Sequence, residues 1–175
     1  MTKRNLYLRR TAFALMILIT VCLNFSFGKF LTVGSAAPLL VLPLVITIAM
    51  NENSLWAVLF GVLAGVLTDC FSISEDGFYG VAFAVAAFAA SSLVTFFVRR
   101  TFAAAAVFMA CASLLVFAAY WFFFLVLKGY DMLFVTLVEK YIASAVYTLA
   151  FVVLFYPLTK WICNRLSRED GANEN

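Results

Sequence analysis

Residues that could carry out chemistry are few in this chain and lie mostly near the ends of apolar segments. One group of candidates is acidic and follows an apolar run; it consists of Asp69, Glu75 and Asp76. The other is a pair of opposite charges, Glu139 and Lys140. Carboxylates brought together inside a membrane could act as general acid and base or line an ion path. Histidine, the commonest general base and a common metal ligand, is absent. This scarcity weakens hydrolytic and metal-dependent functions.

The cysteines do not suggest a metal or redox site. They are widely spaced and form no CxxC pair, at Cys22, Cys70, Cys111 and Cys163. We interpret them as small apolar residues. The sequence also lacks the P-loop, GxSxG, HExxH and dinucleotide-binding motifs. We therefore expect no enzymatic activity, no cofactor and no nucleic-acid partner. A small intramembrane enzyme would have to build its site from Asp69 with Glu75, Asp76 or a cysteine. We consider this hypothesis weaker than the two non-enzymatic functions described below.

The composition predicts an integral membrane protein. Of the 175 residues, 66% are apolar and only 12% are charged, which is more apolar surface than a soluble domain of this size can bury. The pattern predicts an all-α polytopic bundle of six transmembrane helices over 11–161, between a basic N-terminus, 1–10, and a polar tail, 162–175, whose end we expect to be disordered. The six expected helices are 11–27, 31–50, 55–68, 77–98, 102–127 and 133–161.

The distribution of basic residues predicts that both termini are cytoplasmic. A six-helix topology puts nine Lys and Arg residues on the cytoplasmic side and three on the other, which fits the preference of positive charge for the inside. The inner nine are Lys3, Arg4, Arg9, Arg10, Arg99, Arg100, Lys160, Arg165 and Arg168, and the outer three are Lys29, Lys128 and Lys140. A signal peptide also begins with basic residues, but 11–27 has no clear A-x-A cleavage site, so we expect an uncleaved helix.

Two of the expected helices have unusual lengths. Pro38 and Pro43 predict that the helix over 31–50 is short or kinked. The apolar part of 55–68 is about 21 Å long, whereas the hydrocarbon core of a bilayer is about 30 Å thick. Either Asp69 and the turn after it enter the bundle, or the bilayer is locally thin.

The outer ends of the last two helices carry aromatic and charged residues. Tyr120 and Trp121 fit an aromatic belt at the outer interface. The segment 133–161 is too long for one crossing, and Glu139 with Lys140 interrupts it. We interpret these two side chains as reaching water or pairing with neighbours rather than forming a transport relay.

The element around which the chain is organised is 61–80, with the sequence GVLAGVLTDCFSISEDGFYG. Gly61 and Gly65 are four residues apart, so one face of a helix lacks side chains and a neighbouring backbone can approach closely. Asp69 lies where the apolar run ends, and a carboxylate there needs a partner or a polar cavity. A purely structural role for these residues and a role in docking a partner are both consistent with the pattern.

The chain resembles the MreD family of bacterial rod shape-determining membrane proteins. The resemblance lies in its size, its six-helix hydropathy, the APLL segment that includes Pro38, and the G-x-x-x-G-x-x-x-D run with its polar loop and G-x-x-G. The family usually has a proline shortly before the loop glycine, where this chain has Glu75 and Asp76. The family residues that this sequence matches are Gly61, Gly65, Asp69, Gly77 and Gly80, for which the resemblance implies helix packing or partner docking.

The resemblance implies a non-enzymatic subunit of the machinery that elongates the lateral cell wall, in the bacterial inner membrane. The implied partners are an MreC-like single-span periplasmic protein, MreB filaments, a RodA-type glycosyltransferase and its class B transpeptidase. The alternative is a vitamin-binding subunit that resembles the substrate-capture component of energy-coupling-factor transporters, which have a similar length and helix number. Retention of a vitamin by the purified protein would favour that alternative.

Overall fold

The computed structural model describes residues 3–31, 39–72, 77–96, 101–126 and 143–172, and these form helices with short connections. This result confirms the all-α prediction for the described chain. The helices are α1 (Lys3–Leu31), α2 (Val41–Ala49), α3 (Ser54–Phe71), α4 (Phe78–Phe96), α5 (Phe102–Tyr120), the π-helical turn η1 (Trp121–Val126), α7 (Ala143–Ala150) and α8 (Val152–Ala172).

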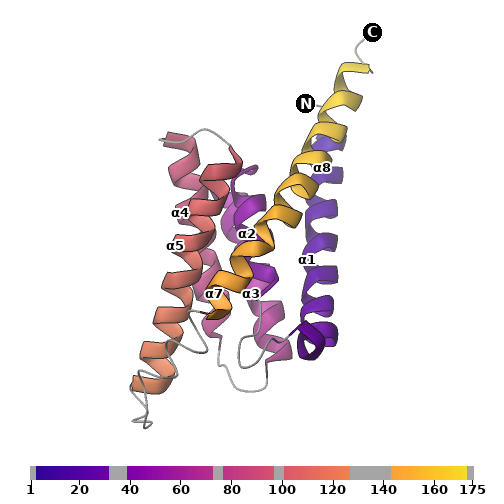
Figure 1. The fold of residues 1–175 in the computed structure, drawn as a ribbon. Helices are drawn as coiled ribbons and strands as arrows, with labels where there is room; N and C mark the ends of the chain where they lie inside the picture. The colour runs from indigo at the N-terminus through magenta and orange to yellow at the C-terminus, as the bar shows by residue number, and fades with distance from the viewer. Residues whose placement is uncertain (1–2, 32–38, 73–76, 97–100, 127–142, 173–175) are drawn as a thin grey trace.

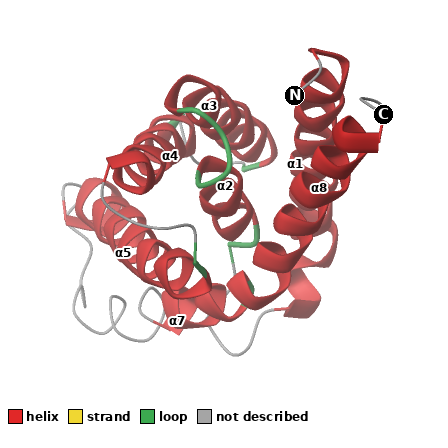
Figure 2. Ribbon diagram, turned by 90° about the horizontal axis from the view of Figure 1, so that it is seen from above, coloured by secondary structure: helices red, strands yellow, loops and turns green. Residues whose placement is uncertain are grey.

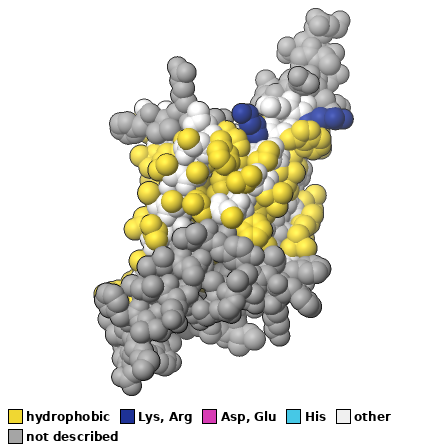
Figure 3. Space-filling view, in the orientation of Figure 1, with side chains coloured by type: hydrophobic (Ala, Val, Ile, Leu, Met, Phe, Trp, Pro, Cys, Tyr) yellow, Lys and Arg dark blue, Asp and Glu magenta, His cyan; other side chains and the backbone are white. Residues whose placement is uncertain are grey.

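Four of the described helices are long and apolar enough to cross a membrane. They comprise Leu6–Ser26 in α1, all of α3, all of α4, and Phe102–Phe123. Hydrophobic side chains cover much of the described surface in Figure 3, and Lys and Arg side chains gather toward one end of the molecule. The start of α1 and the end of α8 lie at that same end (Figure 1). The molecule is therefore a helical membrane protein with its charges gathered away from the apolar middle.

Helix α2 lies in the centre of the bundle. Figure 2, which looks along the bundle, shows it surrounded by the other helices. All nine residues of α2 are buried, and it contacts α1, α3, α4, α5, α7 and α8. A helix that is apolar on every side is stable only when other elements cover it completely. At about 1.5 Å per residue, nine residues span less than half of the hydrocarbon core.

Side chains from two other helices complete the start of α2. The first backbone N–H groups of a helix have no partner within it. The N–H of Leu39 donates to Oγ1 of Thr148 at 3.1 Å, and the N–H of Leu40 donates to Oδ1 of Asn24 at 3.1 Å. Pro43 lies in the first turn, where a missing N–H removes no intrahelical hydrogen bond. Of the two alternatives predicted for 31–50, a short or a kinked helix, the described residues show a short one, Val41–Ala49, while Pro38 lies outside them.

Helix bounds in the first half of the chain differ from the expected ones. Helix α1 includes most of the basic segment 1–10 and ends at Leu31, which was expected to begin the second helix. Helix α3 continues through Asp69 to Phe71, so its 18 residues extend about 27 Å. Asp69 therefore lies within the helix, and its carboxylate is directed at the start of α4, whereas 73–76 lie outside the described residues.

The C-terminal third also differs from the expected helix over 133–161, which was predicted to be interrupted at Glu139 and Lys140. The described part consists of α7 and α8, which meet at Phe151, and α8 contains Pro157. Proline lacks the N–H that would bond to the carbonyl four residues earlier, which loosens the helix just before it. Helix α8 continues to Ala172, so the polar end of the tail, which was expected to be disordered, is helical over 167–172. Glu139 and Lys140 lie outside the described residues.

The contact at the start of α2 generates a prediction for Thr148→Val. Valine has nearly the shape of threonine but cannot accept the Leu39 N–H, and an unsatisfied buried donor costs about 1–3 kcal/mol. We expect a loss of about 1–2 kcal/mol in the free energy of unfolding in detergent micelles.

Thr159→Val is the matched control for this prediction. Thr159 is equally buried, at 0% exposure, but its hydroxyl donates only to carbonyls of its own helix, at Phe155 and Tyr156. Its loss should therefore cost less than that of Thr148. Equal stabilities for the two variants would show that the Leu39 contact contributes nothing.

Candidate functional site

The two glycines of the G-x-x-x-G run lie at the closest approach between α3 and α4. A Cβ atom built on Gly65 would lie 2.5 Å from the Cα of Gly80 and would also strike the carbonyl oxygen of Tyr79. A Cβ on Gly61 would lie 2.7 Å from the carbonyl oxygen of Phe83. Only hydrogen fits in these gaps, so the two backbones touch directly. Such contact supplies the van der Waals packing that holds helices together in a membrane.

Asp69 caps the next helix with both of its carboxylate oxygens. The N–H of Tyr79 donates to Oδ1 at 3.1 Å, and the N–H of Gly80 donates to Oδ2 at 2.8 Å. These donors belong to the first turn of α4, where backbone N–H groups lack intrahelical partners and the helix dipole favours negative charge. A capping residue normally lies next in sequence to the helix that it caps. Here the cap comes from the last turn of α3, so it also joins the two helices.

The other two glycines of this element have different roles. Gly80 faces Asp69, and a Cβ there would make only ordinary contacts, 3.4 Å from Oδ2 of Asp69 and 3.5 Å from Val66. Gly77 precedes α4 with a φ of +79°, a left-handed conformation that side chains rarely adopt. The structure thus brings Gly61, Gly65, Asp69 and Gly80 into one contact, and Gly77 shapes the approach to it.

Aromatic side chains extend this contact to α5. Tyr120 stacks on Tyr79 with ring centroids 6.2 Å apart and meets Phe78 edge to face at 5.6 Å. Tyr120 and Trp121 are half-buried, whereas Phe122 and Phe123 are about half exposed. Tyr120 therefore packs against the start of α4.

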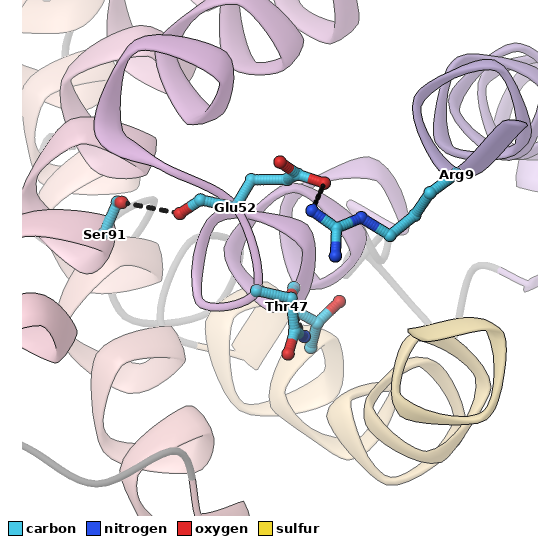
Figure 4. Close-up of polar contacts among 5 residues, drawn as sticks. Arg9, Thr47, Glu52 and Ser91 are labelled. Carbon is cyan, nitrogen blue, oxygen red and sulfur yellow. Dashed lines mark hydrogen bonds and ion pairs between the residues drawn. The ribbon is translucent and has the colours of Figure 1, made fainter. Parts of the chain in front are cut away.

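A second polar contact joins α1 to the turn between α2 and α3. The guanidinium of Arg9 lies 2.7 Å from the carboxylate of Glu52, and both side chains are largely buried, at 13% and 2% exposure (Figure 4). Oγ of Ser91, on α4, donates to the backbone carbonyl of Glu52 at 3.1 Å. Helices α1 and α4 are thus both fastened to one residue of the turn. A buried carboxylate needs such a partner, because an unpaired charge there is strongly destabilising.

The sequence pattern did not predict this pairing, because Arg9 was considered only as one of the basic residues that mark the cytoplasmic side. The available signal was an acidic residue in a short turn on the predicted basic side of the membrane. A carboxylate in so apolar a protein needs a basic partner, and the basic residues of the N-terminal segment 1–10 are predicted to lie on the same side of the membrane.

The next residue along, Arg10, has a different environment. Its guanidinium carbon lies 3.7 Å from the ring centroid of Trp56, in the first turn of α3. Guanidinium groups stack on indole rings through cation–π attraction and planar contact. Together the two arginines attach the start of α1 to the start of α3 and to the turn that precedes it.

The chemistry open to these groups is limited. Both oxygens of Asp69 accept backbone hydrogen bonds, and Glu52 is paired with a cation. Among the residues that the structure describes, no three His, Cys, Asp or Glu side chains are grouped so that they could hold a metal ion. Cys22, Cys70 and Cys111 are exposed and Cys163 is half-buried. Pro38, Glu75, Asp76, Glu139 and Lys140 lie outside the described residues.

Comparisons with protein-family models, with curated proteins and with solved structures find no match to this chain.

The close approach at Gly65 predicts opposite outcomes for two glycine-to-alanine substitutions. Gly65→Ala forces a methyl group into the backbone of α4, and overpacking of this kind costs about 1–3 kcal/mol. Gly80→Ala is the matched control, because its methyl group meets only ordinary contacts and alanine favours helix by up to about 1 kcal/mol. Unfolding of both variants in micelles, followed by circular dichroism, measures the difference. A Gly65→Ala variant as stable as Gly80→Ala would contradict the packing described.

The capping contact predicts that Asp69→Ala lowers the free energy of unfolding by about 1–2 kcal/mol. Asp69→Asn should cost less, because one carbonyl oxygen remains to accept an N–H, although the favourable charge is lost. Asn53→Ala is the control, since Asn53 precedes α3 and its side chain makes no capping hydrogen bond. If truncation at Asn53 and at Asp69 cost the same, the Asp69 contact has no net stabilising effect.

Proposed function

We propose that this chain is a non-enzymatic scaffold of the machinery that elongates the bacterial cell wall. In this role it maintains rod shape from the cytoplasmic membrane by docking an MreC-like single-span periplasmic protein. MreB filaments, a RodA-type glycosyltransferase and its class B transpeptidase are the other proposed partners. The proposal rests on the resemblance of the sequence to the MreD family and on the way the motif residues fold together.

The observation that carries the proposal is that the residues of the motif form one unit. Gly61 and Gly65 bring α3 against α4, and Asp69 fastens the end of α3 to the start of α4. A motif of this kind is expected in a protein that must present a fixed surface to partners, because rigid helices reduce the ordering cost of binding. The motif residues themselves lie between α3 and α4. They would therefore affect partners indirectly, by fixing how these two helices are arranged.

The surface offered to partners would then be the outer face of the hairpin formed by α3 and α4. Its large apolar side chains are exposed, and they include Leu59, Val62, Val66, Val81, Val85 and Phe88. In a membrane such side chains meet lipid or another transmembrane helix, and association depends on how well the shapes fit. A single-span partner supplies one helix of that kind.

The proposed topology has six crossings with both termini in the cytoplasm. Nine of the twelve Lys and Arg residues fall inside under this assignment. Both described chain ends lie at the same end of the bundle, which agrees with an even number of crossings (Figure 1). The short helix α2 would cross only as part of the segment that connects α1 to α3.

The described acids support a non-enzymatic role. A general base must be able to reach a substrate proton. Asp69 uses both oxygens to cap α4, and Glu52 lies buried beside Arg9, at 4% exposure. Neither carboxylate is presented to a substrate in this arrangement.

The proposal is tested by depleting the chain in its own cells and by purifying it gently from them. We expect depleted cells to become round, and we expect a single-span periplasmic protein to co-purify with the wild-type chain. Re-expression of the Gly80→Ala variant should restore rods, whereas Gly65→Leu, which separates α3 from α4, should not restore them at equal membrane abundance.

Unchanged cell shape after depletion would contradict the proposal. Mass spectrometry of the purified chain provides the competing outcome, because a vitamin retained at about one per chain would indicate the substrate-capture function instead. Because Gly65→Leu and Gly80→Ala are compared at the same expression level, a difference in cell shape between them cannot come from a difference in protein abundance.

A further inference from the structure

A preorganised cationic group lies at the end of the bundle where both termini are found. Arg10 is held flat against Trp56, with 3.7 Å between the guanidinium carbon and the ring centroid. Trp56 is itself fixed by Phe60, whose ring centroid lies 6.2 Å away, and Phe60 meets Phe13 of α1 at 6.1 Å. The stacked guanidinium is thus attached to both helices and loses little further freedom when it binds a ligand.

The hydrogen-bonding capacity of Arg10 is not used within the described protein. Its Nε atom is buried and has no hydrogen-bond partner among the described residues. The contrast with the preceding residue is clear, because the charge of Arg9 is balanced by Glu52 at 2.7 Å. Within the described chain, Arg10 makes no ion pair with a carboxylate. A guanidinium presents several N–H donors in a planar fork, which suits the oxygens of phosphate groups.

The position of Arg10 indicates what kind of anion could reach it. The apolar span of α1 begins at Leu6, so Arg10 lies one turn inside that span. Large side chains close to it in sequence or on the neighbouring helix are open to the surroundings: Tyr7 is 66% exposed and Leu55 is 81% exposed. A ligand at this depth must place an anionic group beside the arginine and apolar chains along the helices. A membrane lipid meets both conditions.

We propose that Arg10, stacked on Trp56, binds the phosphate of an anionic phospholipid between the starts of α1 and α3. The fork of Arg10 donates to the phosphate oxygens, and the acyl chains lie along the exposed side chains of the two helices. Basic groups at this depth of a membrane protein commonly interact with anionic lipid headgroups. The lipid would complete the attachment of α1 to α3 from outside the bundle, as Glu52 does from inside.

Native mass spectrometry of the purified full chain tests this proposal, with phosphatidylglycerol as the anionic lipid and phosphatidylcholine as the zwitterionic one. We expect the wild-type chain to retain phosphatidylglycerol in preference to phosphatidylcholine. Arg10→Gln should weaken phosphatidylglycerol binding about tenfold, because it removes a charged bidentate contact. Arg10→Lys should weaken it about threefold, since lysine keeps the charge but not the planar fork.

Arg165→Gln is the matched control. It also removes one arginine beside a tryptophan, since the Arg165 guanidinium carbon lies 5.7 Å from the ring of Trp161, but both of these side chains are exposed on α8. This variant should bind phosphatidylglycerol within about twofold of the wild type, because an exposed arginine contributes little to binding.

Any one of the following results with the lipid assay would overturn the proposal. They are unchanged phosphatidylglycerol binding in Arg10→Gln, equal losses in Arg10→Gln and Arg165→Gln, and equal retention of the two lipids by the wild type.

Competition by inorganic phosphate at the lipid concentration would identify the ligand as a free anion and would also reject a lipid site. If Arg10→Gln fails to fold, the comparison of Arg10→Lys with Arg165→Gln decides the question, and equal binding by those two variants rejects the stacked site. The lipid assay does not depend on cell shape or on any partner protein.

Discussion

Direct contact between the backbones of α3 and α4 is the constraint on which the rest of the described structure depends. Inside a membrane no water is released when apolar helices meet, so association relies on close packing and on polar contacts. Gly61 and Gly65 provide the first, and Asp69 provides the second. The pair thus formed makes one wall of the space that α2 occupies, because α2 contacts both of its helices. A wider separation of α3 and α4 would change the packing on the side of α2 that faces them.

Polar groups in this bundle are satisfied at the two ends of the apolar middle. Asp69 caps α4 at one end, and the contact of Arg9 with Glu52 lies at the other. Buried hydroxyls along the helices, such as those of Thr47 and Thr68, donate to carbonyls of their own helix one turn earlier. These carboxylates and hydroxyls therefore bond either within their own helix or to one neighbouring element. This arrangement fits a medium in which an unsatisfied polar group is costly.

The sequence predicts the local features of this structure better than the distant ones. Helix type follows from composition, and the contact at Gly61 and Gly65 follows from their spacing of four, because both signals lie within one helix. The need of Asp69 for a partner was evident from its position at the end of an apolar run. The N–H groups that bond to Asp69 could not be predicted, because no sequence pattern marks a cap that comes from the preceding helix.

Contacts between distant segments were beyond prediction for the same reason. The donor of Leu39 and its acceptor Thr148 are 109 positions apart, and the hydroxyl of Ser91 bonds to a carbonyl 39 positions earlier. Nothing in the spacing of one apolar segment specifies which other segment lies beside it. The central place of α2 was missed likewise, because an apolar run with two prolines is compatible both with a bent crossing and with a short buried helix.

The position of α2 has a consequence for the order in which the molecule is assembled. This helix is made early during synthesis, yet one of its two capping side chains, Thr148, belongs to a segment made much later. Until α7 emerges, the Leu39 N–H has no protein partner of that kind in a medium that offers no substitute. The surroundings of α2 are therefore complete only after α7 and α8, which both contact it, have been made.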